Sequence, residues 1–298
     1  MSETLTARCP AKLNLALAVG PPRPDGLHPI CSWMTTIDLA DELTITRLPP
    51  DRLSRYAILW HAEARRPREI DWSITKDLAV RAHLALERYC ERALPLQMKL
   101  EKRIPLGSGL GGGSSDAAGM LHAVNELFEL GLSDDTLAGI GLELGADVPF
   151  LVYGGNAIVG GVGDDVDRQP TADTLHAVLV FPESACETAA VYRRFDELGA
   201  SEFRPDAIRT LATGGGEPFN DLMAPALDLT PALATLREAI AGHAERPAHL
   251  SGSGSTLFVR CDDELHADFL ARRLEEALGV PAVATRTGER VVVEAVTS

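Results

Sequence analysis

The stretch Pro105–Ala118 combines residue types that bind phosphate with the turn that would place them. Five of the seven residues from Gly107 to Gly113 are glycine, and two serines and an aspartate follow. Glycine costs backbone entropy on folding, so a run of glycines needs a physical reason. Without Cβ atoms, successive N–H groups can turn towards one anion, and the positive end of a following helix points to the same place. The composition therefore predicts a loop that binds a polyphosphate.

The segments on both sides of this loop argue against the alternative of a flexible Gly/Ser linker. Residues 96–104 alternate between apolar and polar like a strand, and Pro105 ends the pattern. After the loop, apolar residues recur at helical spacing until Gly131. The order of strand, glycine loop and helix is the context in which such a loop binds phosphate.

Other nucleotide-binding motifs fit this loop poorly. A P-loop ends in Gly-Lys-Ser/Thr, and the chain contains no Gly-Lys pair. Residues 107–112 match the string G-x-G-x-x-G, but residues 133–144 have a helical pattern where a dinucleotide-binding fold needs a strand with an acid at its end. The chain also lacks the His-Arg-Asp and Asp-Phe-Gly signatures of protein kinases.

Composition and charge limit the possible partners. With 298 residues and 45% hydrophobic residues, the chain can form one large or two moderate domains. Its formal net charge of −15 argues against nucleic acid or an anionic membrane as partner. Five scattered cysteines without a C-x-x-C pair, no signal peptide pattern and no long apolar run predict a cytoplasmic protein with reduced thiols.

Two further sites have residue types suited to catalysis. Lys12 is one of only four lysines, and it lies two residues from Asn14 on an alternating strand, so the two side chains share a face. That face could equally be the solvated side of an edge strand. Asp147 follows the end of a predicted helix, where an ordinary turn aspartate is the alternative. A turn at Asp25-Gly26 is followed by His28, which a loop would also expose to solvent.

The elements that must position these residues mix long helices with strands in hairpins. The sequence therefore predicts an α+β fold with two domains and mixed, mainly antiparallel sheets, divided into residues 1–158 and 159–298, with the active site in the cleft between them. Strands are expected at 5–20, 34–45 (interrupted by a turn at Asp41-Glu42), 96–104, 150–153, 176–181 and 289–296. A hairpin and loop are expected at 47–71, a hairpin or loop at 154–163, and a Gly/Ser turn before the strand that ends at 259. Helices are expected at 74–94, 117–128, 133–145, 188–198, 231–242 and 262–278, and residues 219–222 are expected to open another helical stretch.

Three separated stretches together resemble the motifs of the GHMP small-molecule kinases, the superfamily of galactokinase, homoserine kinase, mevalonate kinase and phosphomevalonate kinase. They are Pro10–Leu15, Pro105–Ser115 and Leu250–Ser255. Within that superfamily, Asp25-Gly-Leu-His28 and Gly145-Ala-Asp-Val-Pro149 are similar to motifs of the kinases that act on a cytidine diphosphate ester of methylerythritol in the non-mevalonate isoprenoid pathway. The resemblance runs in register from about residue 8 to about residue 256.

The resemblance implies a reaction in which ATP, with Mg²⁺, phosphorylates the C2 hydroxyl of the methylerythritol unit. It places Asp147 at the catalytic aspartate and Lys12 at the catalytic lysine. A carboxylate can orient a tertiary alcohol and take its proton, while an ammonium offsets charge that develops on the phosphoryl oxygens. The ATP-binding residues implied are Pro105, Leu106, Gly107, Ser108, Gly109, Leu110, Gly111, Gly112, Gly113, Ser114 and Ser115, the last also as a ligand of Mg²⁺.

The same resemblance implies a cytidine site. Its substrate-binding residues would be Asn14, Leu27, His28, Thr188 and Tyr192, with His28 at the cytosine edge and the Tyr192 ring stacked on the base. Tyr192 as ordinary helix packing is the alternative. The implied partners are this small molecule and ATP, with no nucleic acid and no membrane, and the chain would be a monomer or a homodimer.

Two positions depart from the family pattern. Leu27 replaces a tyrosine that would cover the second face of the base, and Asp77 replaces an asparagine that helps to hold adenine. These departures concern affinity and base preference. Two competing functions remain: another GHMP kinase, acting on homoserine or a mevalonate derivative, and a GHMP-fold protein without catalysis that senses a ligand. The second of these expects loss of Lys12 or Asp147, and both residues are present.

Overall fold

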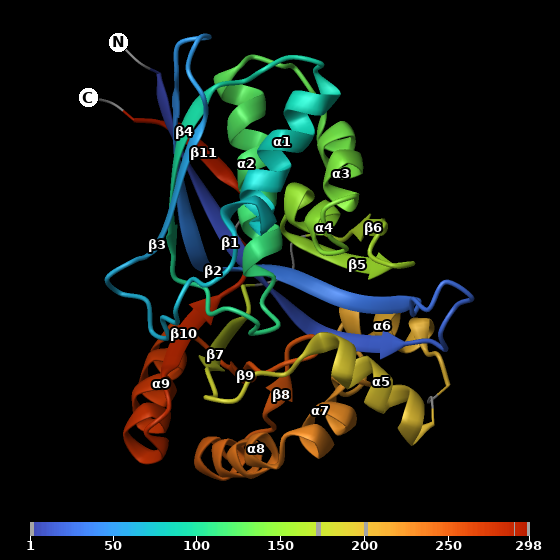
Figure 1. The fold of residues 1–298 in the computed structure, drawn as a ribbon. Coiled ribbons are helices and arrows are strands. Elements are labelled where there is room, and N and C mark those ends of the chain that lie inside the picture. Colours follow the sequence, from blue (N-terminus) through green and yellow to red (C-terminus); the bar gives the residue numbers. More distant parts are fainter. Residues whose placement is uncertain (1–2, 171–173, 200–201, 289, 297–298) are drawn as a thin grey trace.

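The computed structural model of this chain describes residues 3–170, 174–199, 202–288 and 290–296. The fold is α+β with two domains, and each domain has its own sheet (Figure 1). The strands of the first sheet are β11 (Val292–Ala295), β1 (Thr4–Val19), β2 (Ile30–Arg47), β4 (Leu96–Lys102) and β3 (Arg55–Trp60), in that order, with β5 (Asn156–Gly160) beside β2 and β6 (Asp165–Arg168) beside β5. The second sheet has the order β10 (Ala282–Arg286), β7 (His176–Val180), β9 (Leu257–Cys261) and β8 (His249–Leu250).

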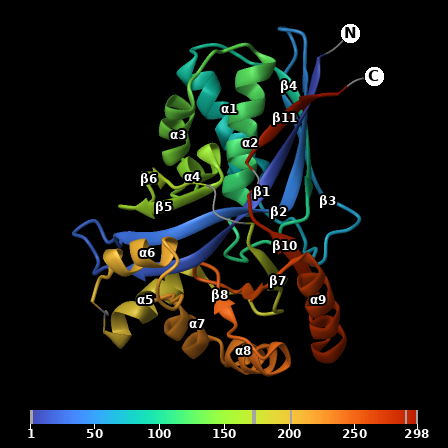
Figure 2. The same ribbon diagram turned by 180° about the vertical axis from the view of Figure 1, so that it is seen from behind.

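Helices of the first domain pack on one face of its sheet and shield a large apolar core (Figure 1). They are α1 (Leu78–Tyr89), α2 (Gly112–Leu127), α3 (Asp134–Leu142) and the short α4 (Val148–Tyr153). The second domain contributes α5 (Thr188–Leu198), α6 (Pro205–Ala212), α7 (Met223–Leu229), α8 (Pro231–Ala244) and α9 (Glu264–Leu278). In the view from behind, α6 packs against the end of β1 and the start of β2, and α9 packs against the second sheet (Figure 2).

Strand β1 joins the cores of both domains. Its first apolar residues pack with α1 and α2 in the first core, its middle residues pack with Phe181 and Phe258, and its end packs in the core of the second domain. From Cys9 onwards every residue of the strand is buried. Neither face of this part of β1 is solvated, so the interpretation of Lys12 and Asn14 as the solvated face of an edge strand was wrong.

Most of the predicted elements are confirmed, but four predictions in the first domain were wrong in type or extent. Residues 30–47 form the single strand β2, whose Asp41 is fully buried and makes no turn. Residues 55–60 pair with β4 in parallel, so they are not part of a hairpin. Residues 150–153 belong to helix α4 and not to a strand, because Pro149 in the first turn favours a helix start. The predicted helix at 74–94 begins only at Leu78, after a 3-10 turn.

Strand β11 confirms a closing strand in the part of 289–296 that is described, and it pairs with β1. The predicted boundary between residues 158 and 159 lies inside strand β5. In addition, β11 follows this boundary in the sequence but belongs to the first sheet. The division by residue number stays a prediction. Among the described residues, no helix is long and apolar enough to cross a membrane, and the cytoplasmic location stays a prediction.

Candidate active site

A cleft of about 1300 Å³ collects residues from both domains. Its walls come from β1, the glycine loop, the start of α4, the start of α5 and the Gly/Ser turn before β9. The predicted site residues that line it are Lys12, Asn14, Leu27, His28, Pro105, Leu106, Gly107, Ser108, Gly109, Gly111, Gly112, Gly113, Ser114, Asp147, Thr188 and Tyr192. Leu110 and Ser115 are fully buried and do not line it.

Lys12 and Asp147 lie close together in this cleft. The Lys12 Nζ is 3.6 Å from Asp147 Oδ2 and donates a hydrogen bond of 2.5 Å to Asn14 Oδ1. The Asn14 Nδ2 in turn donates to Ser32 Oγ at 2.8 Å, and this bond fixes the orientation of the Asn14 amide. Asp147 is at the N-terminal end of α4, where its side chain makes no capping hydrogen bond to the described chain and stays 30% exposed. The arrangement presents one carboxylate and one ammonium side by side to a ligand.

The glycine loop has the backbone that its composition predicts. Gly107, Gly109 and Gly111 adopt φ values of +61°, +77° and +69°, which only glycine adopts without strain. Helix α2 begins at Gly112, directly after the last of these residues, and its first N–H groups are available to an anion. The start of α2 thus faces the cleft that also contains Lys12.

The Gly/Ser turn of the second domain packs against this loop. Ser251 Oγ donates to the Gly109 carbonyl oxygen at 3.0 Å, and the Thr256 N–H donates to the Ser108 carbonyl oxygen at 3.1 Å. A Cβ atom on Gly109 would lie 2.3 Å from the Ser251 carbonyl oxygen. Asn220 holds the turn itself by donating to the carbonyl oxygens of Leu250 and Gly252. The glycine loop and the Gly/Ser turn are therefore in direct contact, and no pattern in the sequence indicated the role of Asn220.

A second group of residues surrounds His28 at the other end of the cleft. The His28 ring lies between the Gly20 carbonyl oxygen, 2.9 Å from Nδ1, and Asp196 Oδ2, 3.4 Å from Nε2. The Tyr192 ring centroid is 5.0 Å from that of His28. Burial, with the nearby Asp147 carboxylate, raises the pKa of Tyr192 to about 12, so its hydroxyl stays neutral. Sequence analysis missed Asp196, which lies one helical turn beyond Tyr192 on α5.

Leu27 and Thr188 complete the region around this histidine. Leu27 is 54% exposed at the cleft rim, where its side chain is free to cover a ligand. The Thr188 Oγ1 and Ser253 Oγ are 2.9 Å apart, which links the start of α5 to the Gly/Ser turn. An aromatic ring, an imidazole and an exposed leucine in one place suit a flat heterocyclic base.

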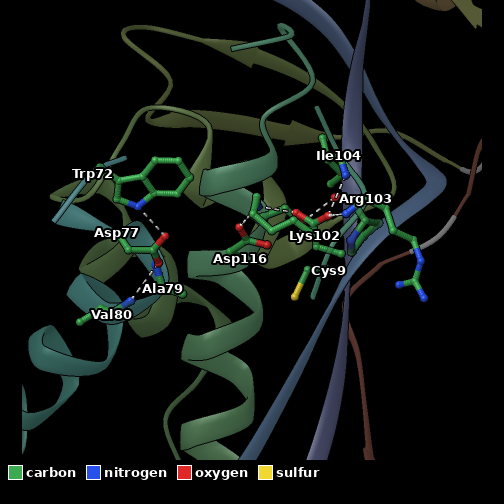
Figure 3. Close-up of polar contacts among 12 residues, drawn as sticks. Cys9, Trp72, Asp77, Ala79, Val80, Lys102, Arg103, Ile104 and Asp116 are labelled. Atoms are coloured by element: carbon green, nitrogen blue, oxygen red, sulfur yellow. Dashed lines mark hydrogen bonds and ion pairs between the residues drawn. The ribbon is translucent and has the colours of Figure 1, made fainter. Parts of the chain in front are cut away.

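Two further residues from the sequence predictions are Ser115, expected as a magnesium ligand, and Asp77, which departs from the family pattern. Ser115 is a poor candidate for a magnesium ligand, because its hydroxyl donates to the Pro10 carbonyl oxygen at 2.6 Å and the residue is fully buried; Ser114 lines the cleft instead. Asp77 caps α1, since its Oδ1 accepts from the N–H groups of Ala79 and Val80 (Figure 3). An aspartate performs that capping role as well as an asparagine.

No cluster of three or more metal-binding side chains occurs within the described ranges. The cleft offers Asp147 and the Ser114 hydroxyl beside the start of α2. This sparse set suits Mg²⁺, which keeps several waters and is held largely by substrate phosphates together with one or two carboxylates.

Comparison with known proteins agrees with this geometry. The family described as GHMP kinases N terminal domain matches residues 77–155, and the GHMP kinases C terminal family matches residues 204–280. The 4-diphosphocytidyl-2-C-methyl-D-erythritol kinase of Polynucleobacter asymbioticus is 37% identical over 266 residues, which are 87% of this chain and 85% of the relative. The enzyme of the same name from Citrifermentans bemidjiense is 36% identical over 287 residues, which are 96% and 99% of the two chains.

Solved structures give the same result. A 4-(cytidine 5'-diphospho)-2C-methyl-D-erythritol kinase superposes with a TM-score of 0.76 at 30% identity, over 95% of this chain and 99% of the other. Homoserine kinase from Cytophaga hutchinsonii superposes with a TM-score of 0.67 at 15% identity, over 98% and 97%, which shows a shared fold alone. The chain therefore belongs to the GHMP kinase family and, within it, to the branch of the 4-diphosphocytidyl-2-C-methyl-D-erythritol kinases. It is an enzyme, a kinase that transfers phosphoryl groups from ATP to a small molecule.

Proposed function

We propose that this chain transfers the γ-phosphoryl group of ATP to the C2 hydroxyl of 4-diphosphocytidyl-2-C-methyl-D-erythritol, in the non-mevalonate pathway to isoprenoid precursors. One observation carries the proposal beyond the family name. Contacts connect the glycine loop to the Lys12–Asp147 pair and that pair to His28 and Tyr192. A Cβ on Gly111 would lie 2.9 Å from Lys12 Cγ, and burial together with the nearby Asp147 carboxylate raises the pKa of Tyr192, whose ring centroid is 5.0 Å from that of His28. That order fits a substrate whose reacting hydroxyl and cytosine base are at opposite ends of one molecule.

In this proposal Asp147 is the general base. Its exposed carboxylate accepts the proton of the C2 hydroxyl while that oxygen forms a bond to the γ-phosphorus. The bond from the γ-phosphorus to the bridging oxygen of ADP breaks, and ADP leaves with the electron pair. The Lys12 ammonium, 3.6 Å from the carboxylate, offsets negative charge on the phosphoryl oxygens during transfer.

The glycine loop and the start of α2 hold the ATP phosphates through backbone N–H groups and the helix dipole. Mg²⁺ bound with ATP would neutralise phosphate charge, and Asp147 and Ser114 are the residues of the cleft that would hold it. Because the loop residues themselves carry no positive charge, phosphate binding depends on these fixed dipoles and on Lys12.

At the other end, His28 contacts the edge of the cytosine and Tyr192 stacks on one face. The Gly20 carbonyl oxygen near Nδ1 and the Asp196 carboxylate near Nε2 hold the histidine ring in one orientation. Leu27 covers the second face with apolar contact in place of the tyrosine of relatives. Thr188 and Asn14 complete the substrate contacts.

The test compares ADP release from ATP and Mg²⁺ with three acceptors: 4-diphosphocytidyl-2-C-methyl-D-erythritol, homoserine and mevalonate. We expect release with the first acceptor alone. Faster release with homoserine or mevalonate would favour the other GHMP kinases, whose solved structures share only the fold at about 15% identity. No release with any acceptor, together with tight nucleotide binding, would favour a sensor without catalysis.

A further inference from the structure

Three charged side chains are buried together beneath the glycine loop, outside the proposed catalytic pair. Lys102 ends β4, Asp116 lies in α2 and Asp41 lies in the middle of β2. The Lys102 Nζ donates to Asp41 Oδ2 at 2.6 Å and also to Asp116 Oδ2 (Figure 3). All three residues are at most 2% exposed. We refer to them as the buried triad.

The triad joins the two ends of the phosphate loop. Lys102 precedes the loop and Asp116 follows it, so their ion pair closes the intervening segment on itself. Asp41 also holds the first end of the loop, because its Oδ1 accepts from the N–H groups of Arg103 at 2.5 Å and Ile104 at 2.8 Å. The start of α2 packs on the same place, since a Cβ on Gly112 would lie 2.9 Å from the Ile104 side chain.

The triad has two carboxyl groups but one amine. Two carboxylates share one ammonium, and Asp116 Oδ1 has no hydrogen-bond partner within the described part of the chain. Burial raises the pKa of Asp116 despite the opposing effect of Lys102, and the two carboxylates keep the pKa of Lys102 above its usual value although burial lowers it. Buried ion pairs of this kind are often no more stabilising than apolar side chains of similar volume. Stability is therefore a weak reason for this arrangement.

We propose that Asp41, Lys102 and Asp116 are positioning residues that set the geometry of the ATP-binding loop by linking its first and last residues. The proposal rests on the proposed function, because it assigns the loop to ATP. A loop with glycines at positive φ has many other conformations available to it. Fixed ends select the one in which its N–H groups converge, so the affinity for ATP depends on the triad while the affinity at the cytidine end does not.

The experiment measures dissociation constants by calorimetry for two probes, the non-hydrolysable analogue adenylyl imidodiphosphate with Mg²⁺ and cytidine diphosphate. Asp116→Leu keeps the branching at Cγ, with a larger side chain, and removes the hydrogen bond to Lys102. We expect it to weaken binding of the ATP analogue at least tenfold and binding of cytidine diphosphate less than twofold. Asp116→Asn keeps an acceptor for Lys102, so it should bind both probes within about threefold of the original protein.

Lys99→Met is the matched control. Lys99 lies on the same strand but is half exposed and pairs with Glu101 at the surface, so neither probe should bind differently. If Asp116→Leu does not fold, the double variant Lys102→Met/Asp116→Leu takes its place, because it leaves only Asp41, which two N–H groups still hold. The same selective loss of ATP analogue binding is expected.

Three outcomes would overturn the inference. They are an Asp116→Leu protein that is folded and binds the ATP analogue normally, an equal loss of both probes, and an Asp116→Asn protein as impaired as Asp116→Leu. If instead the original protein binds no ATP analogue at all, the proposed function fails as well, so the two failures are distinguishable.

Discussion

At the scale of single residues, the space around Lys12 decides which cation fits there. A Cβ on Gly111 would lie 2.9 Å from Lys12 Cγ, and a Cβ on Gly252 would lie 3.3 Å from its Nζ. Glycines bound this side chain on two sides, and the broad planar guanidinium of arginine needs more room than the ammonium. Lys12→Arg should therefore lose turnover at least a hundredfold in a steady-state assay, although the charge is kept. Near-normal turnover would show that Lys12 supplies only a general positive field.

Asp147 is the residue for which a proton-transfer role makes the clearest prediction. Asp147→Asn keeps the shape of the side chain but cannot accept the hydroxyl proton. We expect turnover to fall by about 10²–10⁴, with dissociation constants of both substrates within about tenfold of the original. A variant that keeps more than a tenth of the turnover would exclude Asp147 as the base.

The cytidine end tests the effect of Leu27. Base–aromatic stacking contributes roughly 1–3 kcal/mol per base, and Tyr192 is the ring beside His28 that can supply it. Tyr192→Ala should weaken binding of the cytidine substrate more than tenfold by calorimetry, while Tyr192→Phe should bind nearly normally. Leu27→Tyr should tighten binding about threefold to tenfold, since Leu27 is exposed and a ring there has room to stack. Unchanged binding by Tyr192→Ala would place the base elsewhere.

The sequence motifs predicted more of the residues that line the candidate site than of the buried residues beneath it. Lys12, Asp147, His28 and Tyr192 all line one cleft. The first three could be predicted because they lie in short motifs, whereas Tyr192 was predicted only from its position in the family resemblance. Asp41 was assigned to a turn, since an Asp-Glu pair within an apolar pattern is typical of a turn. Its partner Lys102 comes from a strand 61 residues further along the chain, and no local pattern reports such a pairing.

At the scale of elements, replacing a single glycine by alanine tests the contact between the glycine loop and the Gly/Ser turn. Gly109 and Gly107 both have positive φ, so alanine strains the backbone at either position. A Cβ on Gly109 would also lie 2.3 Å from the Ser251 carbonyl oxygen, whereas a Cβ on Gly107 meets no described atom within 4 Å. Gly109→Ala should thus weaken ATP binding and lower the melting temperature more than Gly107→Ala. Equal effects would mean that backbone strain alone matters.

Elements with regular periodicity and clear end signals were predicted best. Helix α5 has the predicted bounds, and α3 begins at Asp134, directly after Ser133, whose hydroxyl caps it by accepting from the Thr136 N–H. Strand β2 was divided in the prediction at Asp41-Glu42, but both residues lie inside a continuous strand, where Asp41 pairs with Cys9 and Glu42 with Arg8 of β1. Tertiary context decides such cases, and a single sequence does not contain it.

At the scale of the whole molecule, His249 couples stability to pH. Burial, with the Arg260 and Arg237 charges, lowers its pKa from 6.5 to about 4. The folded protein therefore prefers the neutral ring, so this stabilisation is complete above about pH 6.5 and is lost as the pH falls from there towards 4. The melting temperature should fall over this range, and less steeply in His249→Gln. Parallel curves for the two proteins would show that His249 does not contribute.

The return of β11 to the first sheet has a consequence for anyone who divides the molecule. The register pairs Leu5 with Ala295 and Arg8 with Val292, so the second domain is topologically an insertion within the first (Figure 1). A fragment truncated after β6 would leave the outer side of β1 without its neighbour. Open strand edges invite pairing with another copy, so such a fragment would self-associate, whereas a circular permutant that joins the adjacent ends would keep the sheet intact.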